Sequence, residues 1–508
     1  MEGNANLYAL LAAGFPADRA AVAIETPTRF YTWNDVEEIS GRFANLLQAL
    51  ELPAGSRIAV QVEKSPEALM LYLASVRAGL VYLPLNTAYR ESEVEYFLTD
   101  AEPAVVVCDS ANQEWVGRLA EKTGIANVYT LDSDGTGSLA LAAASQPGEF
   151  VNVRSLPDDL AAILYTSGTT GRSKGAMLSH RNLSSNAEVL HKYWGWRPDD
   201  VLLHMLPIFH VHGLFVASHG ALLAGARMLW LPRLDIEQAL HYIPRSTVMM
   251  GVPTYYVRLL ADRRFTRELC ANMRLFISGS APLLKETFDE FKARIGQPIL
   301  ERYGMSETVM LTSNPYDATL GERIGGTVGQ PLPGVMVRVV DDAGKELGEG
   351  EIGNVQVRGP NVFSGYWRMP EKTREEFTAD GWFRTGDVGR WGGDSAPANY
   401  LSIVGRSKDL IISGGFNVYP KEIELLIDDI PGVDESAVIG LAHPDFGEAV
   451  VAVVVPKAGV KLDADAMMAD LKSRLANFKV PKRIYFTDQL PRNTMGKVQK
   501  NVLRDQYA

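Results

Sequence analysis

A glycine-rich loop at residues 165–175 is the segment of the sequence best suited to bind a charged ligand. It reads Tyr-Thr-Ser-Gly-Thr-Thr-Gly-Arg-Ser-Lys-Gly and combines three glycines and five serine or threonine hydroxyls with the positive charge of Lys174. The bare backbone N–H groups of such a loop can surround an anion. A polyphosphate is therefore the expected ligand, and a surface turn rich in small residues is the alternative. The common P-loop differs, because its lysine directly follows a glycine, whereas Lys174 follows Ser173.

Six further segments carry residue types that suit the same chemistry. Each also has a plain structural interpretation: 278–283 reads as a strand-to-helix turn, Ser306 as the cap of a helix, 385–387 as a turn, and Lys497 as a solvated tail lysine. Taken singly, none of them specifies a function. The six segments lie at residues 278–283, 301–308, 381–387, 405–409, 412–424 and 491–497.

The elements that must position these segments alternate between strand and helix up to about residue 300. Residues 1 to about 55 are expected to be mainly helical, with a helix start at 32–35, and 133–148 to be an exposed excursion. The alternation predicts an α/β fold with a doubly wound, largely parallel sheet. The expected strands are 56–63, 81–85, 104–108, 160–164, 201–206, 228–231, 248–252 and 275–278, and the expected helices are 66–79, 91–98, 235–243, 254–262 and 283–294.

The pattern of residue types changes from about residue 321, where short apolar runs and glycine turns predict antiparallel β-structure. A domain boundary is expected near 405–409, giving domains at 1–405 and 406–508, and about 100 residues suit a small α+β domain. The expected antiparallel strands are 335–340, 353–357 and 400–404; the second domain is expected to contain strands 410–413, 435–440 and 449–455, helices 420–430 and 464–476, and a loop-rich tail.

Composition narrows the class of protein. The net charge of −11 argues against nucleic acid as the main partner. Only Cys108 and Cys270 are present, which excludes a disulfide framework and fits a cytoplasmic enzyme. No secretory signal is visible at the N-terminus. The most apolar window, 201–226, contains four histidines and a proline, so we expect buried structure there and no association with a membrane.

The seven segments, in this order, resemble the acyl-adenylating superfamily, which comprises acyl-CoA synthetases, peptide-synthetase adenylation domains and firefly-type luciferases. The loop of that family usually reads Tyr-Thr-Ser-Gly-Thr-Thr-Gly-x-Pro-Lys-Gly, and Ser173 takes the proline position here. The resemblance implies a large N-terminal domain of doubly wound sheets plus a distorted β-barrel, with a small α+β C-terminal lid. It also implies that ATP and a carboxylate form an acyl-adenylate, which coenzyme A then attacks.

The resemblance assigns roles to individual residues. Tyr303 lies against adenine, Ser306 contacts the α-phosphate, Glu307 and Thr170 hold Mg²⁺, and Lys497 is the catalytic lysine. Lys408 is the hinge of the C-terminal domain, and Gly414, Gly415 and Phe416 bind CoA. The implied ATP and AMP set is Thr166, Ser167, Gly168, Thr169, Thr170, Gly171, Lys174, Ser280, Ala281, Pro282, Glu301, Arg302, Tyr303, Gly304, Met305, Ser306, Asp387, which accepts from the ribose hydroxyls, and Arg406.

The acid substrate is indicated by Arg302 and the segment 207–213, which together resemble malonyl-CoA synthetases. Arg302, His210 and Ser280 are then expected to bind the carboxylate of malonate or methylmalonate, with His210 also counted as catalytic. Three local alternatives stay open at this point: Arg302 paired with a structural carboxylate, and the two histidines of 207–213 as a core pair or as a metal site.

Other functions stay open beside malonate ligation. They are a short-chain or aryl monocarboxylate–CoA ligase, and an adenylation enzyme that loads a carrier protein. The second would usually carry an aspartate near 254, where Thr254 and Tyr255 stand. A non-catalytic nucleotide-binding role is disfavoured because Lys497 and Glu307 are both present. Acetylation of Lys497 would remove its charge, so a lysine acetyltransferase and a deacetylase are further expected partners.

Overall fold

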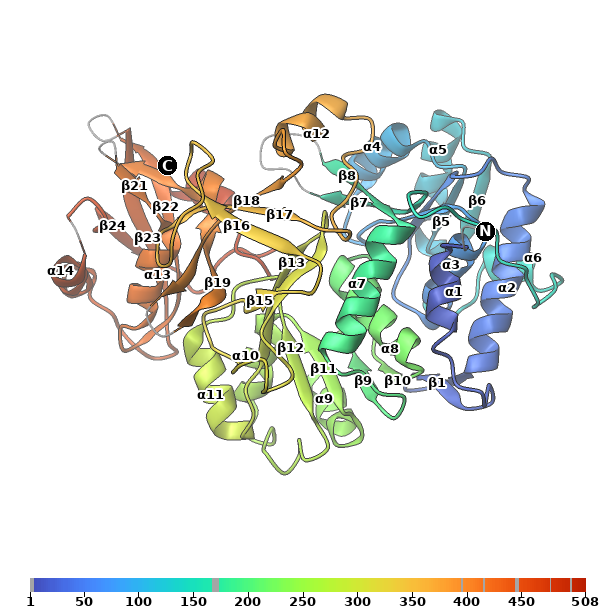
Figure 1. Cartoon of the computed structure of the whole chain (residues 1–508), viewed down its shortest axis with the longest axis horizontal. Helices are drawn as coiled ribbons and strands as arrows, with labels where there is room; N and C mark the ends of the chain where they lie inside the picture. Colours follow the sequence, from blue (N-terminus) through green and yellow to red (C-terminus); the bar gives the residue numbers. More distant parts are fainter. Residues whose placement is uncertain are drawn as a thin grey trace.

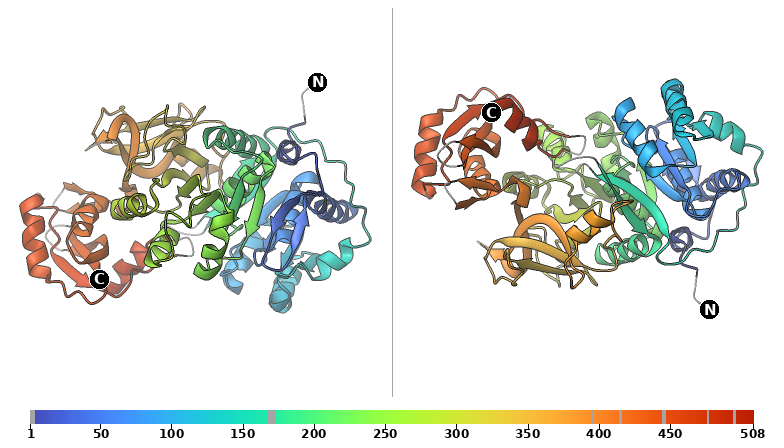
Figure 2. Two further views of the ribbon diagram at one scale, coloured as in Figure 1. Left: turned by 90° about the horizontal axis from the view of Figure 1, so that it is seen from below. Right: turned by 90° about the horizontal axis from the view of Figure 1, so that it is seen from above.

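The computed structural model describes residues 4–166, 173–393, 396–413, 416–443, 447–475, 477–493 and 496–508, with the backbone alone at 416 and 417. Figure 1 shows strands from three regions of the chain arranged along one axis, with the N-terminal sheets at one end and the C-terminal unit at the other. The two views in Figure 2 place the C-terminal unit, orange to red, at that same end. Within the described residues, no helix combines the length and the apolar character needed to cross a membrane.

The first sheet has six strands in the order β6-β5-β3-β4-β7-β8. Its pairs are parallel except for β7 and β8, which run antiparallel because they are joined by the glycine-rich loop. This largely parallel sheet confirms the fold class predicted for the N-terminal region. The strands are β3 (Arg57–Gln61), β4 (Val81–Pro84), β5 (Val105–Cys108), β6 (Asn127–Thr130), β7 (Leu160–Thr166) and β8 (Lys174–Ser179).

The second sheet has nine strands in the order β15-β14-β13-β12-β11-β9-β10-β1-β2. Its centre is parallel, while one edge is the antiparallel hairpin β1–β2 and the other is the antiparallel run β13–β14–β15. The strands are β1 (Val22–Glu25), β2 (Phe30–Thr32), β9 (Val201–His204), β10 (Arg227–Trp230), β11 (Val248–Gly251), β12 (Leu275–Ser278), β13 (Leu300–Met305), β14 (Val309–Ser313) and β15 (Gln330–Pro331).

One layer of helices is shared by both sheets and forms the main core. Side chains alternate along each strand, so Ile58 and Val60 of β3 enter this central core while Ala59 enters an outer one. Helices α1, α3, α7 and α8 lie between the sheets, and α4, α5, α9, α10 and α11 cover the outer faces. The helices are α1 (Leu7–Ala12), α2 (Trp33–Ala49), α3 (Pro66–Arg77), α4 (Glu91–Ala101), α5 (Gln113–Thr123), α6 (Ser138–Ala143), α7 (His180–Tyr193), α8 (His219–Ala224), α9 (Ile236–Tyr242), α10 (Pro253–Ala261) and α11 (Lys285–Ile295).

The rest of the chain forms two smaller sheets. Strands β16 to β19 make a four-stranded antiparallel sheet, which β19 joins to the nine-stranded sheet through a bridge between Gly329 and Leu401. The C-terminal sheet has five strands and its own apolar core. The elements are β16 (Met336–Val340), β17 (Gly353–Arg358), α12 (Pro370–Glu376), β18 (Phe383–Gly393), β19 (Ala396–Arg406), β20 (Ile411–Ser413), β21 (Phe416–Val418), α13 (Pro420–Asp428), β22 (Val433–His443), β23 (Gly447–Pro456), α14 (Ala464–Arg474), β24 (Arg483–Phe486) and α15 (Lys500–Tyr507).

Helices α1 and α2 make the regular structure of the first 55 residues mainly helical, as predicted, but the hairpin β1–β2 was missed. Strand β1 pairs with β10, a partner some 200 residues away in the chain, in a contact that no local pattern reveals. Two other local predictions were wrong. The excursion at 133–148 contains helix α6, whose Leu139 and Ala143 are buried. Ser306 caps no helix, since it lies in the turn between β13 and β14. The predicted helix start at 32–35 is confirmed, with Thr32 and Asp35 forming a capping box.

Candidate active site

The stems of the glycine-rich loop are held by helix α4. The Tyr96 hydroxyl donates to the carbonyl oxygen of Ser173 at 2.7 Å, and the Tyr165 hydroxyl donates to Asp100 Oδ2 at 2.5 Å. Tyr96 and Asp100 stand four residues apart, on one face of the helix. Thr166 and Lys174 face each other across the β7–β8 pair. The predicted ligands Ser167, Gly168, Thr169, Thr170 and Gly171 lie outside the described residues.

Lys174 and Glu307 meet at the ring of Tyr366. The Lys174 ammonium lies 4.3 Å from the centre of that ring, and the Tyr366 hydroxyl donates to Glu307 Oε1 at 2.9 Å. Lys174 Nζ also lies 3.5 Å from Glu376 Oε1 on α12. The predicted phosphate lysine and the predicted magnesium carboxylate are therefore neighbours. Tyr366 was not predicted as a site residue. The sequence offers only a weak indication of it, an aromatic residue that follows Gly365.

The hairpin of β13 and β14 brings most of the segment 301–308 to one place. Glu301, Arg302 and Glu307 are buried, whereas Tyr303 and Ser306 keep partial exposure. Two residues at the borders of this region hold a left-handed backbone, Ser280 with φ 70° and Val309 with φ 55°. Such conformations cost on the order of 1–3 kcal/mol for a non-glycine residue and gather at functional sites.

Asp387 on β18 is held by two residues from the predicted nucleotide set. The Tyr303 hydroxyl donates to Asp387 Oδ2 at 2.5 Å, and Arg406 Nε lies 2.8 Å from Oδ1. Burial and the Asp387 carboxylate raise the pKa of Tyr303 well above its ordinary value, so the phenol stays a donor. This group joins the end of β13 to the end of β19, where the predicted hinge begins.

The loop that carries Lys497 lies against the N-terminal part of the molecule. A Cβ built on Gly496 would come within 3.6 Å of Thr254 Oγ1 at the start of α10. Burial lowers the pKa of Lys497 to about 8, with Arg406 and Lys408 acting in the same direction and Asp387 and Glu307 opposing. The residue nevertheless keeps solvent exposure. The charges of predicted nucleotide and metal residues thus act on Lys497, although the chain separates them widely.

Arg302 is a buried cation for which the described residues supply no carboxylate. Its side chain lies over Gly279, since a Cβ there would come within 2.4 Å of Arg302 Cζ. Nε and Nη2 are buried and have no hydrogen-bond partner, and no ion pair to Arg302 occurs within the described ranges. Burial lowers its pKa to about 9, which leaves the guanidinium charged at neutral pH. The alternative of a structural carboxylate partner finds no support in this part of the chain.

Ser280, His212 and His210 complete the polar wall next to Arg302. Ser280 Oγ lies 3.2 Å from His212 Nδ1, and the fully buried His212 has no partner for Nε2. The backbone N–H of His212 donates to His210 Nδ1 at 3.3 Å. Burial and the charges of Lys497 and Arg302 lower the pKa of His210 to about 3, so its ring is neutral and Nε2 carries the hydrogen. His212 was missed as a site residue, although it stands in the segment 207–213.

The structure describes some of the remaining predicted residues and leaves others out. Glu301 Oε1 accepts from the backbone N–H of Leu283 at 3.2 Å, and burial raises the pKa of its carboxyl to about 8. Gly304 and Met305 lie on β13 beside Tyr303, and Ala281 and Pro282 lie in the loop that follows β12. Gly414 and Gly415 lie outside the described residues, and of Phe416 only the backbone is described. Among the described residues, no group of three or more His, Cys, Asp or Glu side chains is arranged to hold a metal ion.

Replacing Gly279 by alanine should displace Arg302 without unfolding the protein. The new Cβ would come within 2.4 Å of the guanidinium carbon and 2.5 Å of Nη1, and a long side chain can move aside where backbone cannot. We expect kcat/KM for the acid substrate to fall at least about tenfold, since a charged hydrogen bond is worth roughly 1.5–3 kcal/mol. The measurement is steady-state kinetics with a thermal melt beside it. A fully active variant would show that the position of Arg302 does not matter.

Comparison with known families identifies the class of protein. The model of the AMP-binding enzyme family matches residues 11–367, and that of the AMP-binding enzyme C-terminal domain matches residues 422–497. The first match covers more than half of the chain. The chain therefore belongs to the AMP-binding enzyme family, which confirms the resemblance to acyl-adenylating enzymes and the α/β fold with a smaller C-terminal unit.

Three relatives narrow the comparison. Crystalline ATP-bound MatB from Rhodopseudomonas palustris superposes with a TM-score of 0.96 at 56% identity, over 99% of each chain. The mitochondrial malonate–CoA ligase ACSF3 of Mus musculus is 36% identical over 85% of this chain and 78% of its own length. The indoleacetate–CoA ligase of Aromatoleum aromaticum is 34% identical over 96% of this chain and 95% of its own length. CoA ligases for both dicarboxylic and aryl acids are thus similar to this chain.

Proposed function

We propose that the protein ligates malonate, and with it methylmalonate, to coenzyme A with ATP, releasing AMP and pyrophosphate. One observation carries the choice of acid: Arg302 is a buried guanidinium with two unpartnered nitrogens. A buried charge is costly unless it is paired. A dicarboxylate supplies the missing partner with one carboxylate while the other reacts. Kinship with malonate–CoA ligases of Mus musculus and Arabidopsis thaliana supports the same acid.

The wall beside Arg302 fits a carboxylate in hydrogen-bonding capacity as well as in charge. The guanidinium lies over Gly279, the residue before Ser280, and its charge acts on His210 and His212. The buried Nε2 of His212 has no partner, and the neutral His210 offers an Nε2–H donor. Charge-assisted hydrogen bonds to a carboxylate are shorter and stronger than neutral ones. An aryl acid would leave these polar groups unpaired, which disfavours the aryl–CoA ligase alternative. For a carrier-protein loader, Thr254 and Tyr255 again lack the charge that an amino group requires.

The first half-reaction joins the carboxylate to the α-phosphorus. A carboxylate oxygen attacks that phosphorus, a new P–O bond forms, the bond to the bridging oxygen breaks, and pyrophosphate leaves with its electron pair. Because an anion approaches a polyanion, cations must cover the growing negative charge. In our proposal Lys497 and Lys174 do this, and Asp387 accepts from the ribose hydroxyls while Tyr303 lies beside the adenine.

Magnesium fits the proposed site as a partner of the nucleotide rather than as a cage built by the protein. Mg²⁺ usually binds one or two carboxylates together with substrate phosphates and water. The buried Glu307 supplies such a carboxylate, with Tyr366 holding one of its oxygens and the Thr308 hydroxyl left without a partner. When bound, the ion would neutralise phosphate charge. Glu307 and the predicted Thr170 would hold it.

The second half-reaction requires a different arrangement of the C-terminal domain, which we place at residues 406–508. The CoA thiol attacks the carbonyl carbon of the mixed anhydride, a C–S bond forms, the C–O bond to phosphate breaks, and AMP leaves. The electrostatic effect of Asp387 and Glu307 on Lys497 supports the assignment of the present arrangement to adenylation. We propose that rotation about Lys408 then withdraws Lys497 and presents Gly414, Gly415 and Phe416 to CoA. Such domain motions commonly separate two chemistries.

Replacing Lys408 by proline should preserve pyrophosphate release and impair thioester formation. Lys408 lies in a 3₁₀ turn, Ser407–Asp409, and the usual φ of such a turn, about −50 to −70°, includes the value that proline imposes. No hydrogen bond from its backbone N–H occurs among the described residues, so the present arrangement survives while rotation is restrained. We expect the ratio of malonyl-CoA to pyrophosphate to fall at least about tenfold, as for a step losing about 1.4 kcal/mol or more. Equal losses in both half-reactions would indicate misfolding instead.

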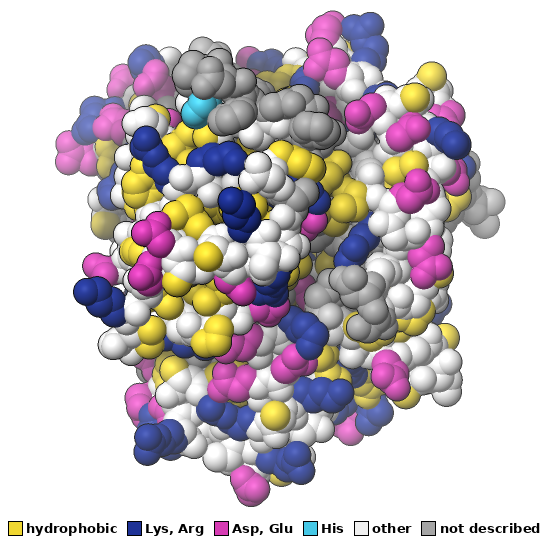
Figure 3. Space-filling view, turned by 90° about the vertical axis from the view of Figure 1, so that its left-hand side faces the viewer, with side chains coloured by type: hydrophobic (Ala, Val, Ile, Leu, Met, Phe, Trp, Pro, Cys, Tyr) yellow, Lys and Arg dark blue, Asp and Glu magenta, His cyan; other side chains and the backbone are white. Residues whose placement is uncertain are grey.

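Two further proposals concern the cell. We propose cytoplasmic residence and control by reversible acetylation of Lys497, which would remove the ammonium charge. Lys497 keeps exposed area and a pKa lowered to about 8, and both favour acylation of its amine. The charge distribution does not favour nucleic acid as a target: on the face shown in Figure 3, Lys and Arg are interspersed with Asp and Glu.

The experiment that tests the proposed function measures pyrophosphate release with a panel of acids, with and without CoA. The panel contains malonate, methylmalonate, propionate, acetate and indoleacetate. We expect malonate to give the highest kcat/KM, followed by methylmalonate. AMP should be released at the full rate only when CoA is present. A higher kcat/KM for propionate or indoleacetate would replace the dicarboxylate proposal by its rival.

A further inference from the structure

Lys64 is a buried lysine that ties the two main sheets together. It follows β3 and is 8% exposed, and its ammonium crosses to the carboxyl ends of β9 and β10 in the other sheet. Nζ donates to His204 Nδ1 at 2.9 Å, to the His204 carbonyl at 2.9 Å and to the Leu231 carbonyl at 2.7 Å. It also lies 4.4 Å from the centre of the Trp230 ring. No carboxylate pairs with it among the described residues.

The hydrogen bonds around Lys64 continue into a chain of defined direction. His204 Nε2 lies 3.1 Å from both Ser218 Oγ and the Gly213 carbonyl, and the Ser218 hydroxyl donates to that carbonyl at 2.9 Å. Burial lowers the pKa of Lys64 well below its ordinary value, yet the three acceptors around Nζ match the three protons of an ammonium. In that form His204 accepts at Nδ1 and donates at Nε2, and the Ser218 hydroxyl donates to the Gly213 carbonyl. This arrangement of protons satisfies each group in the network.

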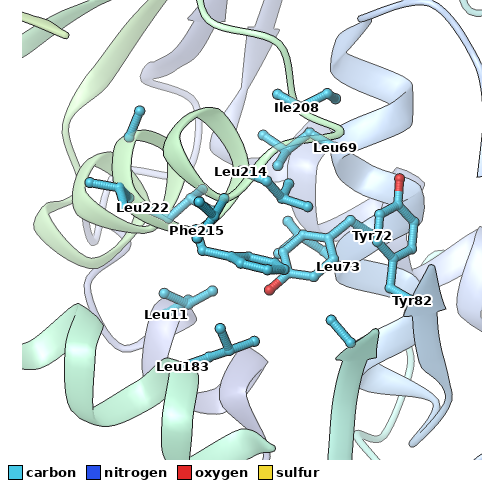
Figure 4. Close-up of a cluster of buried hydrophobic side chains, with 14 of the residues drawn as sticks. Leu11, Leu69, Tyr72, Leu73, Tyr82, Leu183, Ile208, Leu214, Phe215 and Leu222 are labelled. Atoms are coloured by element: carbon cyan, nitrogen blue, oxygen red, sulfur yellow. The ribbon is translucent and has the colours of Figure 1, made fainter. Parts of the chain in front are cut away.

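The series of hydrogen bonds that starts at Lys64 ends on a helix of unusual type. Residues His212–Ser218 form the π-helix η2, a geometry that is rare and occurs often at functional sites. Its first residue, His212, is one of the polar residues that we expect to contact the acid substrate. The next residue is Gly213, and its carbonyl oxygen is the partner of both His204 Nε2 and the Ser218 hydroxyl. On its other side the π-helix packs into the core, where Figure 4 shows Leu214 and Phe215 against side chains of α3. Core packing therefore restrains one flank of η2, and the polar chain restrains the flank that carries His212.

We propose that Lys64 is a positioning residue for the acid pocket, acting through His204 and Ser218 on the π-helix to set the place of His212. The inference rests on the proposed function, because it takes His212 as part of the wall that receives the acid. Lys64 itself touches no substrate. Its loss should therefore weaken the grip on the acid while ATP, which is bound from other elements, is affected little.

The test compares Lys64→Met with a matched control, Arg77→Met. Methionine keeps the length of the side chain and removes the charge and the donors. Arg77 is likewise a buried cation, 5% exposed, which donates to the carbonyls of Glu37 and Phe150 and lies over the Tyr8 ring at 4.4 Å, but it contacts no part of η2 among the described residues. For Lys64→Met we expect KM for malonate to rise at least about tenfold, while KM for ATP in pyrophosphate exchange changes by less than about threefold. Arg77→Met should lower Tm and leave both KM values close to those of the wild type.

Two further variants keep the test decisive if Lys64→Met does not fold. Ser218→Ala removes the far end of the chain and should raise KM for malonate in the same direction. His204→Gln retains one acceptor and one donor and should keep more malonate activity than His204→Leu. A folded Lys64→Met with unchanged KM for malonate, or Ser218→Ala with wild-type kinetics, would overturn the inference. The acid preference of the wild type is measured first: a monocarboxylate preference would reject the proposed function, and KM for that acid would then test Lys64.

Discussion

Replacing Lys497 by alanine should abolish pyrophosphate release, yet leave CoA attack on supplied malonyl-adenylate close to the wild-type rate. The charges of Asp387 and Glu307 act on the Lys497 ammonium, and in our proposal the α-phosphate gathers negative charge in that region. Removing one preorganised donor from such a site costs about a hundredfold to a thousandfold in rate, and a full cation is expected to cost no less. The second half-reaction proceeds after Lys497 has withdrawn, so it should be spared.

The two half-reactions are assayed separately, by pyrophosphate exchange and by malonyl-CoA formation from the adenylate. Lys461→Ala, which removes an exposed lysine of the same C-terminal region, serves as the matched control and should change neither. Equal loss of both half-reactions in Lys497→Ala would show that the assigned role is wrong.

The same lysine predicts the pH dependence of adenylation. Its surroundings lower the pKa of Lys497 from 10.5 to about 8, so the charged form predominates below that pH and is lost above it. If the ammonium is required, kcat/KM for ATP in the exchange reaction should fall as pH rises through about 8, since this parameter reports the free enzyme. A flat profile between pH 7 and 9 would contradict this.

Replacing Arg302 by alanine should collapse malonate use far more than ATP binding. The guanidinium is 3% exposed and has two unpartnered nitrogens, so the second carboxylate of malonate would be its partner in our proposal. A charged hydrogen bond is worth roughly 1.5–3 kcal/mol, and leaving the carboxylate unpaired costs more. We therefore expect kcat/KM for malonate to fall at least about tenfold to a hundredfold. Propionate lacks that carboxylate and should be affected much less.

The control variant Arg302→Lys keeps the positive charge and removes the planar guanidinium group. An ammonium cannot form the two-pronged contact of a guanidinium, so this variant should recover only part of the malonate activity. The measurement is kcat/KM for malonate, methylmalonate and propionate in each variant. Should malonate and propionate fall by the same factor, Arg302 would be structural or directed to ATP, and the dicarboxylate proposal would lose its main support.

Much of the fold followed from local pattern. Strand β12 was predicted at its observed bounds, Leu275–Ser278, because three apolar residues and a serine precede a glycine. The start of α2 followed from Thr32 and Asp35, which form their capping box within one turn. Patterns failed where the partner was remote. Strand β1 is a strand because it pairs with β10, and Ser306 lies in a hairpin because β14 returns beside β13.

The sequence by itself determined the chemical class of this protein, because the relevant residues are close together in the chain. The glycine-rich loop, the segment 301–308 and the motif that ends at Lys497 each span no more than a dozen residues, and their order along the chain carries the resemblance to acyl-adenylating enzymes. Even Arg302 could be singled out, since a charge before Tyr303 is informative without any coordinates. In each of these segments the backbone donors, hydroxyls and charges lie close together in the chain, so covalent geometry sets their spacing.

Only the tertiary structure decided which residues meet at the site and which are left without partners. Lys64 bonds to His204 across 140 positions, and Tyr366 bonds to Glu307 across 59. The unpaired nitrogens of Arg302 and the free Nε2 of His212 are likewise properties of the packed molecule. The physical reason is that burial creates the cost of an unpaired polar group, and burial arises from contacts between segments that the linear order of the chain does not record.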